Sequence, residues 1–598
     1  MFTTRPEIQG TFGAVASTHW VATAVGMSVL ERGGNAFDAA VAAGFTLQVV
    51  EPHQNGPAGD VPILLHEAPS GRTAVICGQG PAPAAATIAR FRDLGLDLVP
   101  GTGLLAAVVP GAFDAWMRLL RDFGTWRVRD VLAPAIAYAR DGYPVSLTLN
   151  AYIDAVRDLL AEAWPTSGAV YLPGGRAPAR GTLLANPALG DTYARIVTEA
   201  EAAGGDRERQ IEAARDAFYR GFVTEGIDRF ARGTEALDSS GRRHSGLITA
   251  DDMAAWESRL EAPVTRDYHG YTLAKTGPWG QGPVFLQALA LLEGYDIPAM
   301  DPNGAEFVHT LVECIKLALA DREAFYGDPD FVDVPLDALL SADHAAARRA
   351  LVGAEASAEL RPSRIEGHEG RLPRRVTGES HATAGARALA AAGAGEPNVA
   401  LLGEKGSDTV NLNICDRHGN MVSAMPSGGW LQSSPVIPEL GFCLGTRLQM
   451  CWLEEGLASS LAPGKRPRTT LTPGLALRDG VPYMAFGSPG GDGQDQWALQ
   501  LFLRHVHHGL DLQQGIDAPA FLSSHAPNSF YPRAARPNHL DLESRFGAEA
   551  ISALQARGHG VEVVGDWMLG RLSAVTKDGA MIRAGANPRN MSGYAAGR

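Results

Sequence analysis

The chain has 598 residues, of which 45% are hydrophobic and 20% charged, and its formal net charge is −14. This size and composition favour a large folded core with long loops over wholesale disorder. The acidic balance, without any block of Lys or Arg, argues against a nucleic-acid partner.

The cysteines and the N-terminal stretch bear on the compartment. The five cysteines are odd in number and form no C-x-x-C pair, so neither a disulfide framework nor a zinc site is expected. The N-terminal stretch lacks the pattern of a signal peptide, and no apolar run reaches the ~18 residues that a membrane helix needs. We therefore expect a cytoplasmic protein that has no membrane partner and needs no metal or cofactor.

The first part of the chain shows mainly helical patterns. Residues 14–50 alternate apolar stretches with small residues and predict a short strand followed by two closely packed helices, the first ending near Gly33–Gly34. Residues from about 110 to 345 are also rich in helical periodicity, including the run from Asn303 to Tyr326. No internal repeat is evident.

A change of composition precedes the most informative segment. Residues 352–405, approximately, are rich in Ala, Gly, Pro, Ser and charge and predict a mobile connector. The following stretch, TVNLNICDRHGNMVSAM, predicts two strands around a turn at Arg417–Asn420. A mobile segment that runs straight into a buried strand opening with Thr is typical of a processing site. An ordinary interdomain linker is the alternative, and composition alone favours it.

Seven segments recur here in an order that resembles the γ-glutamyltransferase family of N-terminal nucleophile hydrolases. They are GGNAFDAAVAAGFTLQVVEPH (33–53), LAPAIAYARDGYPVS (132–146), GLITADDMAAW (246–256), ADREAFYGDPDF (320–331), GKRPRTTLTP (464–473), GSPGG (487–491) and GANPRNMSGYA (585–595). The resemblance implies an α+β fold, a four-layer αββα sandwich. It also implies that segments 1–408 and 409–598 form one interleaved domain, a heterodimer of two fragments after cleavage that can assemble further into a homo-oligomer.

By this resemblance the nucleophile is Thr409, freed by cleavage of the Asp408–Thr409 bond. A Thr hydroxyl needs a base, and the α-amine of a Thr that begins a chain can supply it. The family pattern T-x-H-x-S becomes T-x-N-x-N, with Asn411 and Asn413 at the altered positions. The alternative is that Thr409 is only a strand residue.

Two further elements complete the predicted catalytic set. Ser427 falls where the family has a second hydroxyl that touches the nucleophile, although it could be a simple turn residue beside Gly428–Gly429. Gly490–Gly491 corresponds to the pair whose backbone N–H groups form the oxyanion hole, a role that glycine suits because no Cβ hinders approach. A phosphate loop is excluded because no G-K-[ST] follows, only acidic residues.

The predicted substrate pocket departs from the family. Gln79 replaces the Arg that grips the glutamyl carboxylate, and no acid is found near Gln449–Met450, where the family binds the substrate amine. Thr469–Thr470 replaces a Ser pair. We therefore expect a more neutral pocket, as in the subfamily of acylases and oxamate-type amidohydrolases, in which Arg447 could still grip an anion. The predicted lining residues are Gln79, Trp430, Gln432, Arg447, Gln449, Thr469 and Thr470.

Two weaker patterns are interpreted as structural. His505, His507 and His508 have no acidic partner at a recognisable spacing, so a metal site is not predicted. The consecutive residues Asp321 and Arg322 predict an ion pair.

Three hypotheses follow from the sequence. The leading one is a self-processing Thr amidohydrolase or acylase that acts on a small amide other than a γ-glutamyl compound, through an acyl-enzyme. The second is a γ-glutamyl hydrolase or transferase with a rearranged pocket. The third is an unprocessed pseudoenzyme with a binding or structural role.

Overall fold

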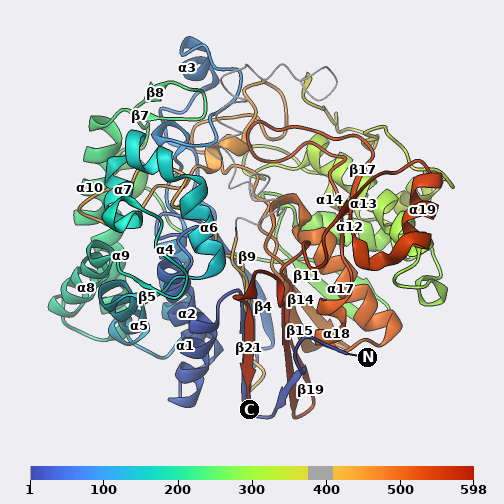
Figure 1. The fold of residues 1–598 in the computed structure, drawn as a ribbon, viewed down its shortest axis with the longest axis horizontal. Helices are drawn as coiled ribbons and strands as arrows, with labels where there is room; N and C mark the ends of the chain where they lie inside the picture. The colour runs from blue at the N-terminus through green and yellow to red at the C-terminus, as the bar shows by residue number, and fades with distance from the viewer. Residues whose placement is uncertain (1, 375–408) are drawn as a thin grey trace.

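Two seven-stranded sheets face each other at the centre of the computed structural model, which describes residues 2–374 and 409–598 (Figure 1). One sheet has the order β1 (Ile8–Gly10), β20 (Met581–Ala586), β19 (Ser573–Asp578), β15 (Val481–Gly487), β14 (Gly474–Arg478), β11 (Tyr271–Lys275) and β10 (Val264–Tyr268). The other has the order β21 (Tyr594–Gly597), β2 (Gly13–Ser17), β12 (Leu412–Asp416), β13 (Met421–Ala424), β3 (Val61–Glu67), β4 (Arg72–Gly78) and β9 (Arg259–Glu261).

Small apolar side chains from both sheets fill the space between them. Ala14 and Cys415 from one sheet share a buried cluster with Ala485 and Val575 from the other. Such short side chains let the sheets approach closely, and the outer faces must then be covered by helices to remove their apolar residues from water.

Helices form the two outer layers, so the predicted αββα sandwich is confirmed. Those on the side of β2, β3 and β12 are α1 (Trp20–Glu31), α2 (Ala36–Val50), α4 (Ala112–Phe123), α5 (Val128–Asp141), α8 (Pro187–Ala202), α9 (Arg207–Tyr219) and α10 (Phe222–Gly233). Those on the side of β14, β15 and β19 are α12 (Gly282–Leu292), α13 (Ala305–Phe325), α17 (Gln494–His508), α18 (Leu512–Asp517) and α19 (Gly547–Ala556).

Several predicted elements lie where the sequence placed them. The run from Asn303 to Tyr326 forms α13, and the first N-terminal helix ends at Glu31, two residues before Gly33 at φ +92°. The close packing predicted for the two N-terminal helices is also found, because a Cβ on Gly26 of α1 would lie 3.6 Å from the Cβ of Ala43 of α2. Among the described residues, no helix is both long enough and apolar enough to cross a bilayer.

Both predicted segments contribute strands to both sheets. In one sheet β12 lies between β2 and β13, and in the other β14, β15, β19 and β20 lie between β11 and β1. This arrangement is what one interleaved domain requires, although a division into fragments at Asp408–Thr409 stays a prediction. Most of the expected connector, together with Asp408, falls outside the described residues.

Candidate active site

Thr409 lies completely buried at the entrance of β12. It forms an isolated antiparallel bridge with Ser427, and Ser427 in turn bridges Asp60, which directly precedes β3. The Oγ1 atom of Thr409 lies 3.1 Å from the Oγ atom of Ser427. The two hydroxyls that the sequence paired are therefore in direct contact.

Two residues that sequence reasoning missed contact Thr409 from the opposite sheet and its helix. Gln494, the first residue of α17, points its Nε2 atom at Thr409 Oγ1 at 3.4 Å. Arg571 donates through Nη2 to the Thr409 carbonyl at 3.0 Å and to Gln54 Oε1 at 2.8 Å. These contacts join residues far apart in the sequence, so no local pattern announces them.

Gly490 and Gly491 lie in the turn between β15 and α17, close to Gln494. Their φ values are +128° and +50°, and a Cβ at Gly490 would collide with the ring of Trp497. Only glycine suits this turn. Among the described residues, the structure records no acceptor for the N–H groups of Gly490 and Gly491, whereas the Gly491 carbonyl accepts from Gln281 Nε2. The turn can therefore offer two donors to an oxyanion.

The altered family positions, Asn411 and Asn413, link the two sheets. The Nδ2 atom of Asn413 donates to Asn411 Oδ1 at 2.6 Å and to the carbonyl and hydroxyl of Ser573 in β19, both at 3.0 Å. Asn411 also contacts the Ser573 hydroxyl. The two amides therefore keep the strand after Thr409 in register with the facing sheet.

The predicted pocket residues differ in how much hydrogen-bonding capacity they keep. Thr470 Oγ1 and Gln79 Oε1 are buried and have no partner among the described residues. The Gln449 amide is engaged, since it donates to the Gly101 carbonyl at 2.9 Å and accepts from the Tyr531 N–H at 3.1 Å. A ligand at Gln449 would have to displace one of these bonds.

The other predicted pocket residues are buried and already make hydrogen bonds. Thr469 Oγ1 accepts from the Leu471 N–H at 3.3 Å, and Gln432 Nε2 donates to the His53 carbonyl at 3.3 Å. Trp430 donates through its indole N–H to the Gln54 carbonyl at 3.0 Å and stands over the guanidinium of Arg447.

A group of buried titratable side chains lies behind Thr409. Burial lowers the pKa of His53, and the nearby Arg571 lowers it further. Burial alone lowers the pKa of His19 to about 3, whereas burial raises the pKa of Glu51. Burial thus shifts all three groups toward their neutral forms.

The expected Asp321–Arg322 ion pair is wrong. Arg322 pairs instead with Glu323 and Asp492, while Asp321 accepts from Ser363 and Gln287. The Asp321 carboxylate is turned toward Ser363 and toward Arg348, 3.8 Å away, so residues distant along the chain take the place that the sequence assigned to Arg322.

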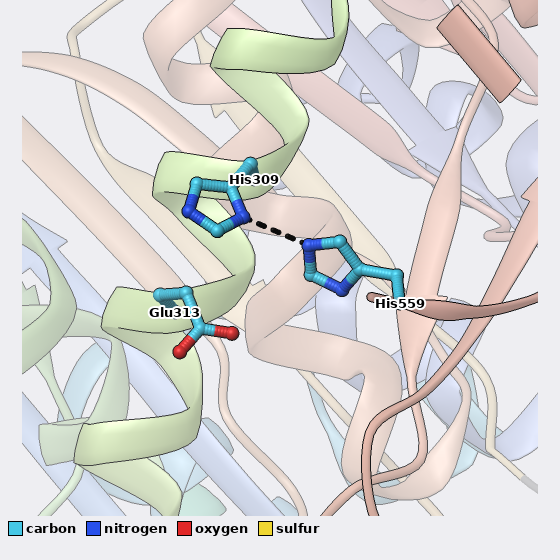
Figure 2. Close-up of side chains that lie close together, drawn as sticks. All are labelled: His309, Glu313 and His559. Atoms are coloured by element: carbon cyan, nitrogen blue, oxygen red, sulfur yellow. Dashed lines mark hydrogen bonds between the residues drawn. The ribbon is translucent and has the colours of Figure 1, made fainter. Parts of the chain in front are cut away.

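Figure 2 shows a His–Glu–His cluster that sequence reasoning did not identify. Ligand-type atoms of His309, Glu313 and His559 lie within 4.8 Å of one another. Glu313, however, already accepts from Lys316 Nζ at 2.7 Å and from Arg361 at 3.1 Å. Two cations beside the single carboxylate oppose a third positive charge, so we interpret this cluster as a structural network.

The His505–His507–His508 run also makes structural contacts. His505 lies 2.7 Å from the Tyr483 hydroxyl, and His507 lies 2.8 Å from the Tyr268 hydroxyl. These bonds attach α17 to the neighbouring strands.

A large cleft lies apart from Thr409. Its volume is about 1240 Å³, and its lining includes Trp256, Trp279, Asp328 and Arg466 but neither Thr409 nor Ser427. Arg466 is anchored there by Asp328 at 2.7 Å and Glu261 at 2.8 Å. Size alone therefore does not identify the candidate site, which the hydroxyl pair and the glycine turn define instead.

Comparison with known proteins places this geometry in context. Residues 22–597 match the sequence model of the family described as gamma-glutamyltranspeptidase. The chain is 30% identical over 591 residues to the glutathione hydrolase-like YwrD proenzyme of Bacillus subtilis, covering 98% of each chain. It is also 30% identical over 598 residues to the oxamate amidohydrolase proenzyme of Klebsiella pneumoniae, again covering 98% of each. The solved structure of LmbA2991HD is 53% identical, with a TM-score of 0.92 and full coverage of both chains.

Proposed function

The chain belongs to the gamma-glutamyltranspeptidase family and is an amide hydrolase, and on that premise we propose that it matures by cutting itself before Thr409 and then hydrolyses a small amide other than a γ-glutamyl compound. The observation that carries this proposal is the contact of 3.1 Å between the hydroxyls of Thr409 and Ser427 inside the sandwich. A buried hydroxyl pair beside a turn with free N–H groups has the parts that acyl transfer needs.

The proposed reaction uses only groups of this chain and water. After the cut, the α-amine of Thr409 takes the proton of its own hydroxyl while Oγ1 attacks the substrate carbonyl carbon. The N–H groups of Gly490 and Gly491 stabilise the oxyanion, and the proton passes to the leaving amine as the C–N bond breaks. Water then attacks the ester on Thr409, which releases the acid and restores the hydroxyl.

Two features argue against a γ-glutamyl substrate. Gln79 cannot replace the guanidinium fork that would hold a glutamyl carboxylate, and Gln449 offers no acid for the substrate amine. The name of YwrD keeps a glutathione-type substrate as the second candidate.

Denaturing electrophoresis tests the self-processing step. The wild-type chain should give two bands, corresponding to 408 and 190 residues, while Thr409→Ala should stay at 598 residues. A single full-length band from both proteins would contradict the proposal and would favour a pseudoenzyme.

Kinetics with the processed protein test the substrate class. Turnover of γ-glutamyl-4-nitroanilide should be slow compared with that of glutaryl-4-nitroanilide, which has the same acyl chain and carboxylate but lacks the α-amine. If the γ-glutamyl compound is the better substrate, the second candidate is correct.

A further inference from the structure

Arg447 is held by Asp60, the residue that forms a bridge with Ser427. Its side chain is 1% exposed, and its Nε atom lies 3.0 Å from each carboxylate oxygen of Asp60. The guanidinium also packs over the rings of Trp430 and Phe530, at 5.0 and 5.8 Å from their centroids. The carboxylate of Asp60 and the two rings restrain the group, so its orientation is set before any ligand arrives.

The other edge of the guanidinium has no partner. Nη1 and Nη2 are both buried, and neither makes a hydrogen bond within the part of the chain that the structure describes. Buried donors without acceptors are costly and rare in folded proteins, particularly on a charged group. The two Nη atoms present parallel N–H groups that match the two oxygens of a carboxylate.

A continuous set of contacts connects this edge to Thr409. Asp60 exchanges backbone hydrogen bonds with Ser427 at 2.8 and 2.9 Å, and the Ser427 hydroxyl touches Thr409. Since adjacent strands are about 4.8 Å apart, the backbone of Asp60 is about 10 Å from that of Thr409. On the far side, Phe530 packs against Gly491, where a Cβ would come within 3.2 Å of its ring. Arg447 is therefore linked to Thr409 through Asp60 and Ser427 on one side and to Gly491 through Phe530 on the other.

We propose that the amide cleaved at Thr409 carries a carboxylate, and that Nη1 and Nη2 of Arg447 bind this carboxylate bidentately. This inference rests on the proposed amidohydrolase function and names its substrate class. A singly charged group is favoured over a phosphate dianion because Asp60 already balances the charge of Arg447, so each further buried negative charge costs more. The carboxylate is therefore bound by Arg447 and not by Gln79, which stands at the position of the family's Arg.

Paired substrates provide the test with the processed full chain. The 4-nitroanilides of succinic and glutaric acid are compared with neutral acyl anilides of equal chain length. In the wild type, the better carboxylate-bearing anilide should have a kcat/KM about 100-fold above that of its neutral match, because two charge-assisted hydrogen bonds are involved. Arg447→Gln should reduce this ratio to below about 10, and Arg447→Lys, which keeps the charge but loses the fork, should give an intermediate ratio.

Binding without turnover separates this inference from the proposed function. Glutarate or succinate should raise the Tm of the wild type and should fail to raise that of Arg447→Gln. The matched control is Arg504→Gln, since Arg504 is equally buried but donates to the carbonyls of Pro302 and Pro519. That variant should keep the wild-type response to the dicarboxylates.

The outcomes are distinct. If no anilide is cleaved but a dicarboxylate stabilises the wild type and not Arg447→Gln, the carboxylate site stands and the hydrolase proposal fails. Equal rates for charged and neutral anilides in the wild type would overturn the carboxylate site and leave the hydrolase intact. An equal rise in Tm for the wild type and Arg447→Gln would also overturn it.

Discussion

Replacing Arg571 by Gln should slow the cut before Thr409 without abolishing the fold. Arg571 donates to the Thr409 carbonyl at 3.0 Å and to Gln54 Oε1 at 2.8 Å, both in a buried setting. The Thr409 hydroxyl must reach the peptide bond that precedes it, so the backbone of Thr409 has to be held in one orientation. Arg571 is therefore expected to act as a positioning residue.

The expected size follows from the bond that is lost. A hydrogen bond from a charged donor contributes about 1.5–3 kcal/mol, and each 1.4 kcal/mol corresponds to about a tenfold change in rate. Loss of the bond to the Thr409 carbonyl should therefore slow processing by about 10- to 100-fold. The bond to Gln54 affects mainly stability and should appear as a lower Tm.

The assay follows the two fragments over time on denaturing gels after synthesis of the chain, with Tm measured in parallel. Arg504→Gln serves as the control, because it removes a buried guanidinium on α17 whose bonds lead to Pro302 and Pro519, away from Thr409. Equal processing rates for the wild type and Arg571→Gln would refute the positioning role. Equal slowing by both variants would show that general loss of stability is the cause.

Two further predictions concern the hydroxyl pair and pH. Ser427→Ala should lower kcat by more than 100-fold if the hydroxyl relays a proton to or from Thr409. Ser427→Thr, which keeps a hydroxyl, should retain most activity. A loss of kcat below tenfold in Ser427→Ala would instead match the loss of a simple neutral hydrogen bond. Burial lowers the pKa of His559 to about 3, so the folded state favours its neutral form. In the unfolded chain, His559 takes up a proton below about pH 6.5, whereas in the folded chain it stays neutral. The free energy of unfolding is therefore unaffected by His559 above that pH and falls as the pH is lowered below it. Tm should therefore drop between pH 7.5 and 5.5, by an amount that corresponds to at most about 1.4 kcal/mol from this residue. His559→Gln should reduce the drop, and an unchanged drop would assign it to other groups.

Local signals were sufficient for several elements. The helical periodicity of α13 and the turn between β12 and β13 depend on residues close in sequence, and both were predicted. The pairing of Thr409 with Ser427 was reached through the resemblance, and the short hairpin of β12 and β13 joins the two residues. In each case the determining residues lie within one supersecondary unit.

Long-range contacts explain what was missed. Asp60 precedes β3, Gln494 begins α17 and Arg571 precedes β19, so these residues meet near Thr409 only after both sheets have formed. An isolated Asp, Gln or Arg in a loop has many possible roles, and no spacing rule selects one. The resemblance pointed to Thr409 as the candidate nucleophile because it compares whole motifs, whereas the residues that surround Thr409 became visible only in the structure.

The interleaving of strands has a consequence for the lifetime of the protein. While the chain is continuous, unfolding and refolding involve one molecule and do not depend on concentration. Once it is cut before Thr409, β12 can return between β2 and β13 only by meeting a separate partner, and refolding becomes a second-order process. Cleavage would thus make unfolding irreversible in dilute solution. The precursor could refold after heating, whereas the two fragments of the mature form, once they have separated, would not.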